Sequence, residues 1–402
     1  MRELIVVAHV PTDSINEGFI PAAKELGLSI ILLTDCAEAF REHYSQAGLP
    51  AYPEEIIACD VFNPMAIIDL VTRRNTAPAA IFSNSDHLQS STAIAAQYFD
   101  LPGKNWLSTY RAKNKAEMRR HLSALGIDTL WHAVVCDTQH LQAIQDPIPY
   151  PCIVKPREGV ASQQVGLAHD RSELNALCKA TWQHQPGQPL LIEEYIAGPL
   201  YTLETLGDGK NISVLGGFRT TLSPLPHFIE LDAVWGTGLS PDSEQQVLEI
   251  IRRFGIGFGA CHTEFVMTES GPRLIEINYR SIGDYREFLL REALQIPLFE
   301  IVLRLYLGEP LPNLPKLSNA AYIRYFTASS SGKLQQAPDA FALVDESYHL
   351  SYKPLRKIGD TIHITHSNKD YLGVLRGYAS CSDRLAAVID KTSQQLAWEI
   401  AS

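Results

Sequence analysis

The segment Leu274–Arg280 reads Leu-Ile-Glu-Ile-Asn-Tyr-Arg, so charged and amide side chains alternate with large apolar ones. A second apolar stretch, Cys261–Met267, precedes it across a short sequence that contains a Gly-Pro pair, which is typical of turns. The two stretches are therefore predicted to form an antiparallel hairpin. Because side chains alternate between the faces of a strand, Glu276 and Asn278 share one face, as does Arg280 if the strand runs that far.

Pairing across this turn is predicted to bring Glu264 alongside Glu276. Two carboxylates and an amide oxygen on one face repel one another without a cation, and hard oxygen ligands suit Mg²⁺. Arg280 would then hold a transferring phosphoryl group or an anionic intermediate, for which its planar fork is suited. The alternative is the polar face of an exposed hairpin. The apolar neighbours favour a half-buried strand instead, where acids need a reason to be present.

The composition narrows the class of protein. The chain has 402 residues, 46% hydrophobic and 20% charged, which is typical of a soluble globular protein with about two or three domains. A formal net charge of −11 provides no global basic field for nucleic acid or anionic membranes. No stretch approaches the ~20 apolar residues that span a bilayer, and the first apolar run is too short for a signal peptide. The seven cysteines are scattered without a C-x-x-C pair, so we expect neither disulfides nor zinc and predict a cytoplasmic protein.

Residues 1–110 have the pattern of an α/β domain. Short apolar runs at Leu4–Val7, Ser29–Leu33 and Ala79–Phe82 predict buried parallel strands, and Glu17–Leu26 predicts a helix between the first two. No G-x-G-x-x-G follows the first strand, so a structural or substrate-facing domain is favoured over a dinucleotide-binding one.

After residue 200, capping and proline residues predict where several elements begin and end. Ser240 is a predicted N-cap for a helix that ends at Gly255, and a strand is predicted at Ile212–Phe218. A proline-rich sequence at 309–315 marks a boundary. Beyond it we expect two alternating strands and a final helix at about 382–400.

Two lysines and one acidic pair lie where phosphate and adenine could be bound. Lys155 ends an apolar strand before a flexible loop, whose N–H groups can fold over a phosphate that the lysine neutralises. Lys115 opens a predicted helix after Asn114. The strand that begins at Leu190 runs into Glu193 and a Gly-Pro turn, and its extended backbone could meet an adenine edge. Taken singly, each feature is more often a surface lysine or an ordinary strand end.

The order and spacing of these pieces resemble the ATP-grasp superfamily. The resemblance implies an ATP-grasp fold, α/β overall and α+β in the ATP-binding part, with an N-terminal parallel-sheet pre-ATP-grasp domain. It implies domains at 1–110, 111–310 and 311–402, the core being divided into a small lobe (about 111–192) and a large lobe (about 193–310), and the last region forming a C-terminal α+β subdomain. ATP would be bound by Lys115, Lys155, Ser162, Glu193, Glu194, Tyr195 and Ile196. Glu264, Glu276 and Asn278 would hold Mg²⁺, with Mn²⁺ as the alternative, and Lys155 and Arg280 would act in catalysis.

Two positions depart from the pattern of the superfamily. The loop after Lys155 contains a single glycine, Gly159, where many relatives are glycine-rich. Leu200 stands where amino-acid ligases commonly carry a ribose-binding glutamate. Glu204 or Glu194 would then take over the ribose contact.

The shared chemistry of the superfamily is phosphorylation of a carboxylate by ATP, followed by attack of an amine on the acyl phosphate. The resemblance is strongest to L-amino-acid ligases of peptide-antibiotic or siderophore pathways, through His262 beside Glu264 and through Glu230. It implies small-molecule carboxylate and amine substrates, bound by Arg219, Glu230, His262 and Arg280, and a homodimer, since dimers are common among these enzymes. His262 as a core histidine, and Glu230 as a partner of Arg219, are the structural alternatives. Purine-biosynthesis or carboxylase chemistry, or a non-catalytic ATP-binding regulator, are the functional ones.

Overall fold

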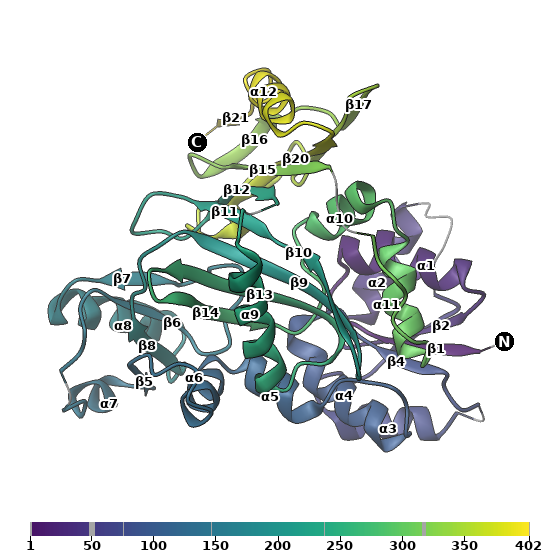
Figure 1. Ribbon diagram of the computed structural model, residues 1–402, viewed down its shortest axis with the longest axis horizontal. Helices are drawn as coiled ribbons and strands as arrows, with labels where there is room; N and C mark the ends of the chain where they lie inside the picture. The colour runs from purple at the N-terminus through teal and green to yellow at the C-terminus, as the bar shows by residue number, and fades with distance from the viewer. Residues whose placement is uncertain are drawn as a thin grey trace.

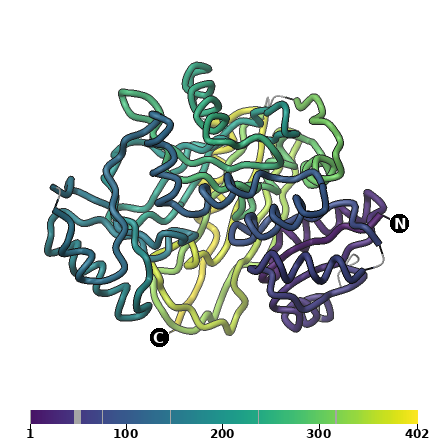
Figure 2. The backbone as a smooth tube through the Cα atoms, turned by 90° about the horizontal axis from the view of Figure 1, so that it is seen from below, coloured from purple at the N-terminus to yellow at the C-terminus, as the bar shows by residue number. Residues whose placement is uncertain are grey.

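The structure is a computed structural model that describes residues 2–47, 53–74, 76–145, 147–236, 238–315 and 319–401. The described residues form four sheets. In Figures 1 and 2 the N-terminal parallel-sheet domain and a small antiparallel lobe lie at opposite ends of the molecule, and the largest sheet lies between them. None of the helices in these residues combines the length and apolarity that crossing a bilayer requires.

The N-terminal sheet is parallel, in the order β3-β2-β1-β4. Its elements are β1 (Glu3–Val7), α1 (Ile20–Glu25), β2 (Ser29–Thr34), α2 (Ala37–Ala47), β3 (Glu55–Ala58), α3 (Pro64–Thr72), β4 (Ala80–Phe82) and α4 (Gln89–Tyr98). The three predicted strands are confirmed, whereas the predicted helix at 17–26 is a π-helical turn, Ser14–Phe19, that continues into α1. The segments after β1 and β4 leave the carboxyl edge of this sheet, which is the usual ligand edge of parallel sheets.

The small lobe supplies the two predicted phosphate-binding lysines. Helix α5 (Trp106–Lys113) leads into it from α4. The lobe contains α6 (Lys115–Ala124), β5 (His132–Val135), α7 (Thr138–Gln142), β6 (Cys152–Pro156), β7 (Gly166–Ala168), α8 (Arg171–His184) and β8 (Leu190–Glu194), with sheet order β5-β8-β6-β7. Asn114 caps α6 by accepting a hydrogen bond from the Glu117 amide. Lys115 is therefore fixed at the first turn of α6, and Lys155 lies on the central strand β6.

The largest sheet follows the order β14-β13-β9-β11-β12-β15-β20-β18-β17, with β10 paired to β9. Its strands are β9 (Leu200–Asp208), β10 (Ile212–Gly216), β11 (Phe218–Leu222), β12 (Glu230–Trp235), β13 (Phe258–Thr268), β14 (Gly271–Asn278), β15 (Ala320–Thr327), β17 (Phe341–Asp345), β18 (Tyr348–Pro354) and β20 (Tyr371–Ala379). The predicted strand at 212–218 breaks in two because Gly216 turns the chain with a φ of 137°. The predicted C-terminal subdomain is continuous with the large lobe in this sheet, because β15 pairs with β12.

The remaining elements complete the C-terminal region. β16 (Gly332–Gln336), β19 (Thr361–Ile362) and β21 (Glu399–Ala401) form a small sheet. The predicted final helix ends early, since α12 (Ser382–Ser393) is followed by β21.

Three helices join the domains. In α9 (Pro241–Phe254) the predicted caps are confirmed, because Ser240 accepts a hydrogen bond from the Ser243 amide and Gly255 ends the helix with a positive φ. Helices α10 (Arg286–Leu294) and α11 (Leu298–Tyr306) share one hydrophobic core with the N-terminal sheet, where Phe299 meets Phe19 edge to face. The N-terminal domain and the large lobe are thus packed through a common core, and the cavities described next open beside it.

Candidate active site

The predicted hairpin is present and aligned as the sequence suggested. In the β13–β14 pair, Glu264 lies opposite Glu276 and His262 lies opposite Asn278. The Asn278 amide donates a hydrogen bond of 3.3 Å to Glu264 Oε1. The hairpin therefore brings the three predicted metal ligands together.

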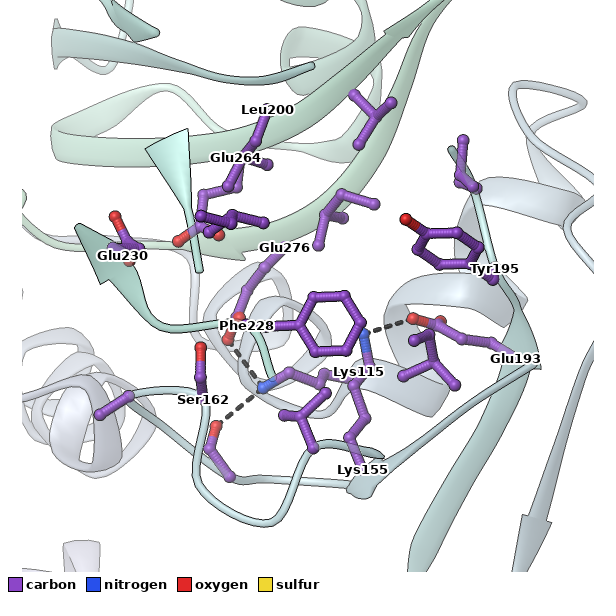
Figure 3. A pocket seen from close by; sticks show the side chains of 18 of the residues that line it. Lys115, Lys155, Ser162, Glu193, Tyr195, Leu200, Phe228, Glu230, Glu264 and Glu276 are labelled. Carbon is purple, nitrogen blue, oxygen red and sulfur yellow. Dashed lines mark hydrogen bonds and ion pairs between the residues drawn. The ribbon is translucent and has the colours of Figure 1, made fainter. Parts of the chain in front are cut away.

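The two predicted phosphate-binding lysines are buried rather than solvated. Lys115 Nζ lies 2.7 Å from Glu276 Oε1 and donates to the Gly159 carbonyl at 2.8 Å, while Lys155 forms an ion pair with Glu193. Figure 3 shows both side chains reaching into one cavity, which we call the nucleotide cavity. Burial lowers the pKa of Lys155 in spite of Glu193, whereas for Lys115 the Glu276 carboxylate outweighs burial and raises the pKa. The surface-lysine alternative is wrong for both.

Glu193 supports Lys155 instead of facing adenine with its side chain. Its carboxylate is buried between Lys155 and Arg119, whose Nε donates to Glu193 Oε2 at 2.8 Å. Burial alone would raise its pKa, but these two cations lower it to about 2. Sequence reasoning missed Arg119, although its position four residues after Lys115 places both on one face of α6.

The other predicted nucleotide contacts line the same cavity. Glu194 ends β8, Tyr195 and Ile196 follow it along the cavity, and Ser162 lines the cavity from the loop after β6. The remaining walls are mostly apolar and include Ile153, Leu200, Phe228, Val266 and Ile275. A mostly apolar cavity that also contains two lysines suits a nucleotide.

Glu204 does not take the ribose role proposed for it. Its buried carboxylate accepts from Thr202 Oγ1 at 2.7 Å and pairs with His262 Nδ1 at 2.8 Å. The reason is the register of the sheet, which sets Glu204 on β9 directly opposite His262 on β13. Glu194, which lines the nucleotide cavity, remains the predicted substitute for the missing acid at Leu200.

His262 bridges two carboxylates. Its Nδ1 meets Glu204 and its Nε2 lies 3.1 Å from Glu264 Oε1, so both ring nitrogens donate when the ring is charged. Burial lowers the pKa of His262, but the two carboxylates outweigh it and raise the pKa to about 10. The alternative of a histidine bonded only to backbone is therefore wrong. His262 orients Glu264 and also lines the second cavity.

This second cavity, of about 580 Å³, lies between the N-terminal domain and the large lobe. We call it the substrate cavity. It is lined by residues 8–10, 12–15, 84–87, 160–162, 282–288 and 368–369, by Glu230 and Arg280, and by the hairpin. Arg280 projects from just beyond β14 and donates to the Ser281 carbonyl at 2.9 Å. Among the described residues, no carboxylate forms an ion pair with Arg280. Its guanidinium is therefore available to an anionic ligand.

The structure corrects the placement of Arg219 and the expected partner of Glu230. Arg219 is exposed and lines neither cavity, because strand alternation turns Phe218 and Thr220 inward instead. Glu230 lines both cavities, but it pairs with Arg286 and accepts from Asn368 Nδ2 at 3.2 Å, not from Arg219. No local signal could have revealed these partners, which lie 56 and 138 residues away.

A four-stranded lobe facing a large sheet across a lysine-lined cavity is the arrangement of an ATP-grasp protein. Residues 148–287 match the family model for the ATP-grasp domain. This part of the chain is therefore an ATP-grasp domain.

Comparison with individual proteins agrees with this assignment. An L-amino acid ligase from Bacillus licheniformis superposes over 100% of this chain and 99% of its own, with a TM-score of 0.82 and 19% identity. Phosphoribosylglycinamide synthetase from Anaerococcus prevotii superposes with a TM-score of 0.73 and 16% identity over 100% of both chains. At these identities the superpositions establish a shared fold.

The relatives found by sequence are longer proteins than this chain. An uncharacterized protein of Sinorhizobium fredii, y4rH, is 26% identical over 83% of this chain and 69% of its own. Carnosine synthase 1 of Gallus gallus is 25% identical over 76% of this chain. The chain spans only 36% of that carnosine synthase.

Proposed function

We propose that the protein is an ATP-dependent carboxylate–amine ligase that forms an amide with release of ADP and phosphate. One observation supports this proposal above the others: the nucleotide cavity and the substrate cavity meet, and Glu264 and Glu276 line both. A phosphoryl group held between these acids would face a carboxylate in the substrate cavity. The superfamily assignment and the ligases among its relatives point the same way.

The proposed roles follow from the contacts. Lys115 and Lys155 neutralise the ATP phosphates, and the apolar slot beside Tyr195 takes the adenine. The carboxylate and amide oxygens of Glu264, Glu276 and Asn278 fit Mg²⁺, with Mn²⁺ as the alternative, and would hold the ion. When bound, such an ion neutralises charge on the phosphoryl group. Lys115 and His262 now donate to the two glutamates, so these oxygens already bind positive partners.

The reaction has two balanced steps. A carboxylate oxygen attacks the γ-phosphorus, the bond to the ADP oxygen breaks, and an acyl phosphate forms. An unprotonated amine then attacks the carbonyl, phosphate leaves, and the nitrogen loses a proton to give the amide. Arg280, whose guanidinium forms no ion pair with a carboxylate of the described residues, stabilises the acyl phosphate. Because acyl phosphates hydrolyse, the loop that carries Ser162 excludes water between the two cavities.

The proposed carboxylate is an amino acid or a small organic acid. The similar proteins whose names specify a reaction of this kind, an L-amino acid ligase and carnosine synthases, support this class. A peptide-antibiotic or siderophore pathway and a homodimeric state belong to the same proposal.

The test is a substrate screen. The protein is incubated with ATP, Mg²⁺ and pooled amino acids, ADP is measured by a coupled assay, and new amides are identified by mass spectrometry. Formation of ADP, phosphate and an amide in equal amounts supports the ligase. Tight ATP binding without ADP formation under every substrate condition would indicate the regulator instead.

A further inference from the structure

Six residues line both the nucleotide cavity and the substrate cavity, and we call the place that they surround the junction. They come from the β6–β7 loop, from the start of β12 and from the hairpin: Val160, Ala161, Ser162, Glu230, Glu264 and Glu276. In Figure 3, Ser162, Glu230 and Glu276 lie at the same end of the nucleotide cavity. The acyl phosphate of the proposed reaction would form at the junction, so the contacts that close the junction determine whether water reaches it.

The loop part of the junction depends on a contact from elsewhere in the chain. Ala161, Ser162 and Gln164 have positive φ angles of 56°, 55° and 57°, which are uncommon for residues other than glycine and persist where the surroundings enforce them. Among the described residues, one hydrogen bond joins residues 160–164 to the rest of the protein. The Asn368 amide donates it to the Ala161 carbonyl at 3.1 Å. Asn368 therefore holds the tip of the loop over the junction.

Asn368 also holds a second part of the junction, Glu230. Its Nδ2 donates to Glu230 Oε1 at 3.2 Å, and its Oδ1 accepts from the Glu230 amide at 3.1 Å. Asn368 is buried, with 7% of its surface exposed, and it lines the substrate cavity. A carboxamide carries both a donor and an acceptor, so it can bind the carboxylate and the backbone of Glu230 at once.

The turn that carries Asn368 is itself fixed. Ser367 and Asp370 are buried and form a reciprocal capping box around the 3₁₀ turn Asn368–Asp370. His366 stacks on His227, with 4.1 Å between the ring centroids, and so joins the turn to the β11–β12 loop. Asn368 begins the turn, where a helix leaves amide donors without an internal acceptor, and its amide is therefore available to the β6–β7 loop.

We propose that Asn368 is a positioning residue that closes the junction, because its amide holds the β6–β7 loop and its side chain holds Glu230. The inference rests on the proposed ligase function, since that function supplies the acyl phosphate. With the junction closed, the amine displaces phosphate and the amide forms. With the junction open, water attacks the acyl phosphate, which returns the carboxylate and phosphate and leaves ADP formed without amide. Asn368, outside the matched residues 148–287, thus couples ATP use to amide formation.

Two substitutions separate the two contacts of Asn368. Asn368→Ala removes the side chain and keeps the amide donor, whereas Asn368→Pro removes both. Proline is compatible with this position, because position 368 begins a helical turn and Ser367 before it is extended, with a ψ of 176°. His363→Ala is the control, since His363 is exposed in the same subdomain and lines neither cavity.

ADP and amide are measured together with the substrates that the screen identifies. We expect equal amounts from the wild type and from His363→Ala. Both Asn368 variants should form more ADP than amide, with the larger excess in Asn368→Pro. A loss of folded protein lowers ADP and amide equally, so it does not produce this excess. If Asn368→Pro does not fold, Asn368→Ala decides the result, and equal ADP and amide in every folded variant overturns the inference.

Limited trypsin digestion tests the loop contact without turnover. Trypsin does not cleave Lys155 before Pro156, so Arg157 is its site in the β6–β7 loop, and cleavage there requires the loop to open. Cleavage after Arg157 should be about threefold to tenfold faster in Asn368→Pro than in Asn368→Ala, the range for the loss of one hydrogen bond. Equal rates in the two variants overturn the inference. A wild type that forms no ADP contradicts the ligase function, and the cleavage rates then still decide whether Asn368 holds the loop.

Discussion

Glu193→Gln tests the buried charge network behind the nucleotide cavity. The substitution keeps the shape of the side chain but leaves Arg119 and Lys155 buried without their shared carboxylate. The fall in the pKa of Glu193 from 4.5 to about 2 corresponds to about 3 kcal/mol of stability. Removal of one member of a buried pair costs about 3–5 kcal/mol in other proteins, so the two figures agree.

The assay is urea unfolding at pH 7 followed by tryptophan fluorescence, since Trp131 and Trp182 pack in the small lobe. We expect Glu193→Gln to destabilise the lobe by about 3 kcal/mol. Glu173→Gln, which removes an exposed acid of the same lobe that pairs with His169, should change stability by less than about 0.5 kcal/mol. A loss below about 1 kcal/mol for Glu193→Gln would refute the network as a source of stability.

The pH dependence gives the same prediction a second readout. The folded pKa of Glu193 lies below its ordinary value, so its contribution is present above pH 4.5 and is lost as the pH falls toward 2. The stability gap between wild type and Glu193→Gln should therefore be constant near neutral pH and shrink in that acidic window. A gap that instead widens there would contradict the assignment of the charge.

Three further predictions concern the site. Arg280→Lys should reduce turnover by about tenfold to a hundredfold with little change in the KM for ATP, because an ammonium cannot form the two-point contact with an acyl phosphate; a change confined to KM would count against the role of Arg280. Arg219→Ala should leave the rate and KM of both substrates unchanged in steady-state assays, because Arg219 is exposed outside both cavities; an effect above about threefold would show that the cavity extends further. Removal of divalent ions with EDTA should abolish ADP formation, and Mg²⁺ or Mn²⁺ should restore it; full activity in EDTA would exclude a metal site at Glu264 and Glu276.

Local sequence patterns correctly predicted the elements that depend on neighbouring residues, namely a hairpin and a capped helix. The hairpin of Glu264 and Glu276 follows from strand alternation around a turn, and α9 follows from its caps at Ser240 and Gly255. Lys115 and Lys155 were likewise placed by the elements that they begin and end.

The partners of these residues depend on strand order, which no local pattern reveals. Glu204 was one of two residues expected to contact ribose in place of Leu200, yet β9 lies against β13 and directs Glu204 to His262. Arg286 and Asn368 reach Glu230 from α10 and from the C-terminal region for the same reason. The continuity of β12 with β15 also escaped prediction, because the proline-rich segment between the domains reads as a boundary.

The measurement that tests the central claim most directly follows an oxygen atom. A substrate identified by the screen is labelled with ¹⁸O in its carboxylate, and the inorganic phosphate released during amide formation is analysed by mass spectrometry. If the carboxylate attacks ATP where the two cavities meet, one labelled oxygen must pass to phosphate when the amine displaces it from the acyl phosphate. We therefore expect singly labelled phosphate in an amount equal to the amide. Amide formation with unlabelled phosphate would contradict an acyl phosphate at Glu264, Glu276 and Arg280.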